Sequence, residues 1–154
     1  FTLARPGSGI YGVGGDDKYS KFLSLAMTVK SYIIQIKEVN KGEGIGYDWT
    51  YTTPRKMKIA ILPIGYADII PRSSSGKLYV YINGTKRKVL GRISMDQIII
   101  EANERDKIND DVIIFGNGKN CRQTIFDVAK AGDAFPLEIL CHTGYRINRE
   151  YINK

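Results

Sequence analysis

The fold class is decided by the stretch Leu78-Tyr79-Val80-Tyr81-Ile82-Asn83-Gly84-Thr85-Lys86-Arg87-Lys88-Val89-Leu90. Aliphatic and aromatic residues that favour strands lie on both sides of Asn83-Gly84. An Asn-Gly pair is the strongest short-range signal for a hairpin, because both positions of the tight turn need a positive φ angle. The stretch therefore predicts two antiparallel strands, over residues 78–82 and 87–90.

Further strands are expected on both sides of this hairpin. Residues 25–39 are rich in valine, isoleucine and tyrosine, which indicates one long strand or two strands that meet at a bend. Residues 58–64, 97–101 and 111–115 have the composition of strands and are bounded by turn residues. These short strands predict a mostly β, barrel-like or sandwich-like domain.

Helical periodicity appears only near the C-terminus. Thr124 followed by Asp127 has the pattern of a capped helix start, and Gly132 is expected to end that helix. Pro136 is placed to open a second short helix that reaches Cys141.

The first residues do not fit the β domain. Residues 2–5 are expected to end a strand that runs into the loop Pro6-Gly7-Ser8-Gly9, with irregular chain over residues 12–21. A strand end followed by a glycine-bearing loop is typical of an α/β barrel, whose functional residues lie at the C-terminal ends of its strands. We expect residues 1–24 to be the end of such a barrel and residues 25–154 to be a complete β domain.

Composition is ordinary for a globular protein, with 154 residues, 43% hydrophobic and 25% charged. The net charge of +7 would suit a nucleic-acid surface, but only Lys86-Arg87-Lys88 is clustered, so a solvated face is favoured. We expect no membrane span in this segment and a cytoplasmic location. Because the chain begins at Phe1 without methionine, we expect that a segment was removed or that the chain is a piece of a longer polypeptide.

The cysteines and the histidine carry no site pattern. Cys121 and Cys141 are too few for a disulfide framework and lack metal-ligand spacing, so reduced, structural thiols are expected. His142, the single histidine, is expected to be structural, and no metal is assigned.

Two glycine–tyrosine segments flank the strand predicted over residues 58–64. They are Gly46-Tyr47-Asp48-Trp49-Thr50 and Gly65-Tyr66-Ala67-Asp68. A tyrosine held at a strand end can act as an acid or base. Alone, such a pair is more often structural, for example with Tyr47 packed on Trp49.

Two downstream segments complete an ordered set: Gly91-Arg92-Ile93-Ser94-Met95-Asp96-Gln97 and Gly144-Tyr145-Arg146-Ile147-Asn148-Arg149. This set resembles the C-terminal half of the pyridoxal-phosphate-dependent alanine racemases, over essentially the whole chain from Arg5 to Arg149. The resemblance implies the end of the amino-terminal barrel followed by the C-terminal β domain. It also implies interconversion of L- and D-alanine through an aldimine of pyridoxal 5'-phosphate (PLP), which supplies D-alanine for peptidoglycan in the cell wall.

The resemblance assigns roles at the substrate. Tyr47 matches one of two catalytic acid/bases, which act on opposite faces of the substrate carbon, and reaches into the site of the other subunit of a homodimer. Tyr66 matches a tyrosine at the substrate entrance. Met95 and Asp96 match the turn whose methionine N–H binds the substrate carboxylate. Ile69 departs from the family, which usually has glycine at that position.

It also assigns roles at the cofactor. Arg5 matches an arginine that faces the pyridine nitrogen, Gly7 and Ser8 match the phosphate loop, and Tyr145 matches a tyrosine that hydrogen-bonds the phosphate. The cofactor lysine of the family lies in the amino-terminal barrel, and no lysine here is in a matching context. The isolated chain is therefore expected to be inactive.

Two alternatives remain open at this point. The protein could be a racemase for serine or for several amino acids, or, in a different class, a stand-alone basic β module that binds anionic partners. The resemblance implies a small amino-acid substrate and no nucleic-acid partner.

Overall fold

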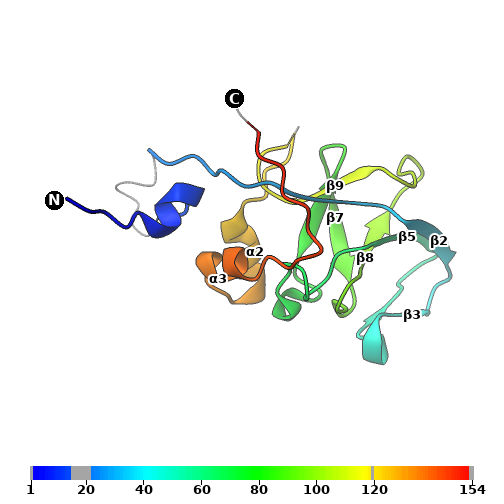
Figure 1. Cartoon of the computed structure of the whole chain (residues 1–154). Helices are drawn as coiled ribbons and strands as arrows, with labels where there is room; N and C mark the ends of the chain where they lie inside the picture. The colour runs from blue at the N-terminus through cyan, green and yellow to red at the C-terminus, as the bar shows by residue number, and fades with distance from the viewer. Residues whose placement is uncertain (1, 15–21, 119, 153–154) are drawn as a thin grey trace.

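The structure is a computed structural model that describes residues 2–14, 22–118 and 120–152. Within them, seven strands form one curled sheet, in the order β1-β9-β6-β7-β8-β5-β2 (Figure 1). All neighbouring strands are antiparallel. The strands are β1 (Val29–Tyr32), β2 (Gln35–Val39), β5 (Met57–Leu62), β6 (Tyr79–Ile82), β7 (Thr85–Leu90), β8 (Ile98–Ala102) and β9 (Asp111–Phe115). The predicted mostly β fold class is confirmed.

The two edge strands of this sheet are consecutive in the chain. Only Ile33 and Ile34 separate β1 from β2, and their N–H groups donate to Asp110 O at 3.2 Å and to Ile61 O at 2.9 Å. One bent segment therefore pairs with β9 in its first half and with β5 in its second. This shared segment curls the sheet toward a barrel. The stretch over residues 25–39 thus forms two strands that meet at a bend.

The predicted hairpin joins β6 to β7. Asn83 and Gly84 have φ angles of 49° and 76°, and Ile82 is paired with Thr85 across the turn. Both angles are positive, as a two-residue turn of this kind requires. The hairpin prediction is confirmed.

One large apolar cluster fills the inside of the curl. It includes the fully buried Leu62, Val80, Ile100 and Val112 from four strands. Helices α2 (Ile125–Gly132) and α3 (Pro136–Cys141) lie beside one another next to the sheet (Figure 1) and add residues to the same cluster.

Helix α2 begins where the sequence predicted. The Thr124 side chain accepts a hydrogen bond from the Asp127 N–H, and the Asp127 carboxylate accepts one from the Thr124 N–H. These bonds satisfy two N–H groups that the first turn of a helix leaves without acceptors. The predicted cap and the predicted helix at Pro136 are both confirmed.

A small two-stranded ribbon, which the sequence did not predict, extends from the sheet. Strands β3 (Gly44–Ile45) and β4 (Tyr51–Thr52) are joined by the 3-10 helix η2 (Tyr47–Trp49). A second apolar cluster anchors this ribbon, made of Val39, Ile45, Met57, Ile59 and Leu90. The turn that carries Tyr47 is therefore fixed to the strands through Ile45.

The amino-terminal segment differs from the prediction. Residues 2–6 have no regular structure, and residues Gly7–Tyr11 form the 3-10 helix η1. A strand needs a neighbour for its backbone groups, and the described residues provide none here. Val13 packs into the large cluster. The irregular chain predicted over residues 12–21 lies largely outside the described residues, and the domain boundary near Leu25 remains a prediction.

The basic stretch Lys86-Arg87-Lys88 is not a uniformly solvated face, so that part of the prediction was wrong. Arg87 is buried, with its side chain paired to the buried carboxylate of Asp106. Within the described residues, no helix has both the length and the apolar character needed to cross a lipid bilayer.

Candidate active-site loops

The turn that carries Tyr47 packs backbone to backbone against the segment after β7. Gly46 has a φ of 77°, and a Cβ atom placed on it would lie 2.9 Å from the Arg92 nitrogen. A Cβ atom on Gly91 would lie 2.4 Å from the Ile45 oxygen. Only glycine permits such an approach at both positions. The two glycines thus set Tyr47 beside the segment that leads to Met95.

Tyr47 itself projects outward, with 63% of its surface exposed. Trp49 lies against the ribbon rather than in the core, because a Cβ atom on Gly44 would be 2.4 Å from its Cγ atom. The Tyr47 hydroxyl is therefore open to a molecule outside this chain.

Asp48 makes an ion pair with Arg92 across the same contact. Its φ and ψ angles of 56° and 18° are left-handed, a region that aspartate tolerates better than most residues. The pair joins the Tyr47 turn to the β7 end by charge as well as by shape.

The loop with Tyr66 docks onto the turn with Met95. The Tyr66 N–H donates to Ser94 O at 3.0 Å, and the Ala67 N–H donates to Met95 O at 2.9 Å. A Cβ atom on Gly65 would lie 2.4 Å from both carbonyl oxygens, so the approach needs glycine. In the part of the chain that the structure describes, the Met95 N–H has no hydrogen-bond acceptor. A donor without an acceptor is free to bind a carboxylate.

The third segment reaches the same place from the C-terminus. The Gly144 N–H donates to Asp68 O at 2.6 Å, and a Cβ atom on Gly144 would lie 2.5 Å from Ala67 O. Tyr145 follows directly, with its side chain fully exposed.

A buried carboxylate joins these loops. Asp68 is 1% exposed and accepts hydrogen bonds from the Gly65 N–H at 2.8 Å and from Arg146 Nε at 2.9 Å and Nη2 at 3.0 Å. Arg146 Nη2 also reaches Asp96 O at 3.3 Å. The hydrogen bonds with Asp68, and then its charge, raise the pKa of Arg146 above its ordinary value. An arginine guanidinium is not deprotonated in proteins, so Arg146 holds its positive charge against the Asp68 carboxylate.

The structure thus brings together Tyr66, Met95, Asp96 and Tyr145, and it holds Tyr47 on a neighbouring turn. It does not bring Arg5, Gly7 and Ser8 to Tyr47. Figure 1 shows the blue segment with η1 and the cyan turn with η2 at opposite ends of the molecule. Arg5 and Gly7 are exposed, and a Cβ atom on Gly7 would meet nothing within 4 Å.

Asp68, Arg92 and Arg146 lie within the motifs found in the sequence, but no role was predicted for them. The spacing of Gly65 and Asp68 could have revealed the local turn, because a side-chain acceptor three residues after the start of a turn can reach back to the first N–H of that turn. The partners of Asp68 and Arg92 lie 78 and 44 residues away, and no sequence pattern marks them.

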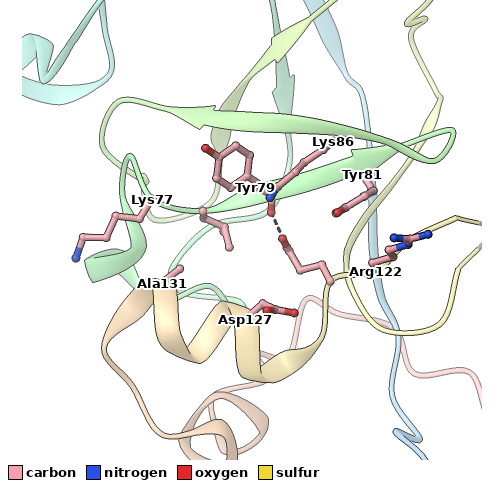
Figure 2. Close-up of a pocket in the computed structure, with 9 residues that line it drawn as sticks. Lys77, Tyr79, Tyr81, Lys86, Arg122, Asp127 and Ala131 are labelled. Carbon is pink, nitrogen blue, oxygen red and sulfur yellow. Dashed lines mark hydrogen bonds between the residues drawn. The ribbon is translucent and has the colours of Figure 1, made fainter.

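The sheet also carries a polar hollow of about 180 Å³ between the β6–β7 hairpin and α2, shown in Figure 2. It contains none of the predicted site residues. Lys86 lies over the Tyr79 ring at 4.0 Å, and Gln123 donates to the Tyr79 carbonyl. The charged ends of Lys77 and Arg122 point away from the hollow in Figure 2.

The cysteines and His142 form no site in the described residues. Cys121 and Cys141 are free thiols, and no group of three or more His, Cys, Asp or Glu side chains is arranged to hold a metal ion there.

Comparison with known proteins identifies the family. The family model described as "Alanine racemase, C-terminal domain" matches residues 26–151. The chain therefore belongs to the family of alanine racemase C-terminal domains. The resemblance stated from the motifs is confirmed, and with it the fold.

Individual relatives agree with this assignment. Alanine racemase from Halothermothrix orenii is 38% identical over 156 residues, which covers 99% of this chain and 41% of that protein. The structure of alanine racemase from Streptomyces coelicolor A3(2) matches with a TM-score of 0.86 and 33% identity, over 94% of this chain and 39% of that one. Alanine racemase from Bartonella henselae, described with covalently bound pyridoxal phosphate, matches with a TM-score of 0.81 and 34% identity, over 94% of this chain and 40% of that one. The chain thus spans about two fifths of the length of these relatives.

Proposed function

We propose that the protein to which this chain belongs is a PLP-dependent alanine racemase, an isomerase that interconverts L- and D-alanine. The family assignment and the relatives named alanine racemase support this. D-alanine made in the cytoplasm would supply peptidoglycan synthesis. The observation that carries the proposal is the docking of the Tyr66, Met95 and Tyr145 loops on one another.

The docked loops supply what an amino-acid substrate needs. Met95 offers to the substrate carboxylate an N–H that has no acceptor among the described residues. Tyr66 lies on the loop that contacts the Met95 carbonyl and is partly exposed, which suits a place at the substrate entrance. Asp96 follows Met95 in the same turn.

The amino-terminal residues and Tyr145 fit the cofactor by their chemistry. The open backbone at Gly7 and the adjacent Ser8 hydroxyl can donate to a phosphate, and so can the exposed Tyr145 hydroxyl. PLP, when bound, supplies a ring that withdraws electrons from the substrate carbon and makes its proton acidic. Arg5 can donate a hydrogen bond to the ring nitrogen but cannot hand over a proton, because its guanidinium pKa lies above about 12. This limits electron withdrawal and favours return of the proton to the same carbon over side reactions.

Tyr47 is proposed as one of the two acid/bases. Racemisation needs one group on each face of the carbon, because a single base would return the proton to the face it left. The second group is the cofactor lysine, which is assigned to the amino-terminal part of the protein, so the chain alone should not racemise alanine. In this structure Tyr47 and the Arg5–Ser8 segment lie at opposite ends of the molecule (Figure 1). That separation supports a site built from two subunits of a homodimer, in which Tyr47 serves its partner.

Mixing two inactive full-length variants tests the shared site. One carries Tyr47→Phe, and the other lacks the cofactor lysine. In a mixed dimer one site has both bases and the other has neither, so alanine racemase activity should return to about a quarter of the wild-type level under random exchange. Tyr47→Phe alone should still bind PLP, since the hydroxyl moves a proton and does not anchor the cofactor.

Tyr32→Phe is the matched control, because Tyr32 is also a partly exposed tyrosine but lies on β1. It should retain activity without mixing. If subunits are shown to exchange and activity does not return, the shared site is wrong.

The burial of Arg87 argues against the alternative of a stand-alone basic module that binds anionic partners. Arg87, the centre of the basic cluster, is buried against Asp106 and is not available to an anionic partner. Assays with serine beside alanine would decide between a narrow and a broad racemase.

A further inference from the structure

We propose that Asp68 and Arg146 act as a positioning pair that sets the substrate-carboxylate turn, the entrance tyrosine and the cofactor-phosphate tyrosine relative to one another. This inference rests on the proposed function for the names of those three parts. Its physical content is the placement of the loops 65–68, 94–97 and 144–146. Neither residue is proposed to touch the reacting atoms.

The contacts of Asp68 reach two of the three loops. Its carboxylate accepts a hydrogen bond from the Gly65 N–H within its own loop. It also accepts hydrogen bonds from Arg146 Nε and Nη2, which belong to the third loop. Its own carbonyl accepts from the Gly144 N–H at 2.6 Å. A carboxylate that is almost completely buried makes such bonds in low-dielectric surroundings, where they are stronger than at the surface.

Arg146 adds the remaining loop. Its Nη2 reaches Asp96 O at 3.3 Å and Pro63 O at 3.4 Å, in addition to the Asp68 carboxylate. The guanidinium is planar, so one side chain can hold a carboxylate edge-on and still donate to carbonyls beyond it. Because Asp96 O belongs to the residue that follows Met95, Arg146 fixes the turn that presents the free Met95 N–H.

The pair therefore controls how the Met95 N–H is aimed. Without Arg146, the bonds of Tyr66 and Ala67 to the Ser94 and Met95 carbonyls remain, and so does the bond from the Ser94 N–H to Gln97 O, but the Asp96 carbonyl loses its side-chain donor. Substrate binding should weaken more than the chemical step, because the Met95 N–H binds a carboxylate that is equally charged before and during the reaction.

The test uses the full-length enzyme with Arg146→Gln, because replacing the buried Asp68 risks loss of folding. We expect the KM for alanine to rise about tenfold, the effect of losing charge-assisted hydrogen bonds, with kcat changed less than about threefold. Arg146→Lys keeps the positive charge but loses the two-nitrogen geometry of the guanidinium, so its KM for alanine should lie between those of wild type and Arg146→Gln. Arg149→Gln is the matched control, since it removes an exposed arginine three residues further along the chain.

A second measurement does not depend on activity. Amide hydrogen exchange followed by mass spectrometry should be about tenfold faster for peptides over residues 64–68 and 93–98 in Arg146→Gln. The exchange rate of the peptide over β9 should be the same as in wild type, and so should the rates of all peptides in Arg149→Gln.

The outcomes separate the two proposals. Faster exchange in the named peptides of an enzyme that does not racemise alanine would support the positioning pair and remove the proposed function. Exchange in Arg146→Gln equal to that in Arg149→Gln, or a fall in kcat with KM unchanged, would overturn the positioning pair.

Discussion

Arg87–Asp106 and Arg146–Asp68 are both two-bond arginine–aspartate pairs, but they lie in different parts of the molecule. Arg87 Nε and Nη2 lie 3.1 and 3.0 Å from the Asp106 oxygens, and Arg146 Nε and Nη2 lie 2.9 and 3.0 Å from those of Asp68. In the first pair both side chains are buried, at 9% and 3% exposure. In the second the aspartate is 2% exposed and the arginine 54%.

The difference in exposure indicates that one pair stabilises the fold and that the other supports the candidate site. Arg87 bridges the middle of β7 to the turn after β8 and shows almost nothing to solvent, so it can only contribute to the fold. Arg146 leaves half of its side chain at the surface where the candidate site loops meet. A buried pair inside the sheet is expected to affect stability, and a half-open pair among loops is expected to affect binding.

The largest effect is expected for Asp106→Ala. It removes both carboxylate oxygens that accept from Arg87 Nε and Nη2, and the acceptor of the Asn103 N–H, whose nitrogen lies 2.7 Å from Asp106 Oδ2. An uncompensated buried charge should lower the free energy of unfolding by about 3–5 kcal/mol. Urea denaturation of the chain measures this.

Glu104→Ala is the control for that variant. Glu104 also pairs with a basic residue, Lys58, but its side chain is 81% exposed. It should change the urea midpoint far less. Equal midpoints for Asp106→Ala and Glu104→Ala would mean that burial does not distinguish the two pairs.

A double replacement sharpens the comparison. Arg87→Met with Asp106→Leu removes both buried charges, and we expect the free energy of unfolding to return to within about 2 kcal/mol of the wild type. Arg146→Met with Asp68→Leu should not restore alanine binding in the full-length enzyme, because the donor to Asp96 O is absent. Recovery of a wild-type KM in that second double variant would show that the Arg146 pair is only structural.

The sequence predicted those parts of the fold that depend on neighbouring residues. Asn83-Gly84 and the Thr124–Asp127 cap are local signals, since each needs contacts over three residues or fewer. The β3–β4 ribbon was missed because strands of two residues have no periodicity to detect. The strand expected over residues 2–5 failed because a strand also needs a partner.

The site divides in the same way. The motifs named Tyr66, Met95 and Tyr145 but did not show why these three residues gather. The gathering depends on Arg146 meeting Asp68 across 78 residues and on close backbone approaches at Gly65 and Gly144. Such contacts follow from the completed fold and leave no spacing in the sequence.

A third arginine–aspartate pair, Arg92–Asp48, extends the comparison to the surface, with side chains 34% and 69% exposed. At Asp48 the backbone conformation should affect the free energy of unfolding more than the ion pair does. Both Asp48→Ala and Asp48→Gly remove the pair, but only alanine is strained at a φ of 56°. Asp48→Ala should therefore be less stable than Asp48→Gly by about 1 kcal/mol in urea denaturation. Equal stability of the two variants would contradict a left-handed backbone at this position.

The smallest effect is expected for an exposed pair, Lys56–Glu38, whose charged atoms are 3.0 Å apart with side chains 68% and 56% exposed. The hydrogen bond from Lys56, and then its charge, lower the pKa of Glu38 below its ordinary value of 4.5. Because the pKa is lower in the folded state, the pair stabilises the fold above the unfolded pKa, and this contribution is lost as pH falls through the folded pKa.

Comparison with Lys56→Gln isolates this contribution, since the other carboxylates titrate in both proteins. The difference in unfolding free energy between wild type and Lys56→Gln should be constant above about pH 5 and shrink below about pH 4. Added salt should reduce it at every pH, because exposed charges are screened by salt. A difference that grows on acidification would show that Lys56 stabilises the chain by something other than Glu38. In that case, the graded effect of burial proposed for these ion pairs would not extend to the surface.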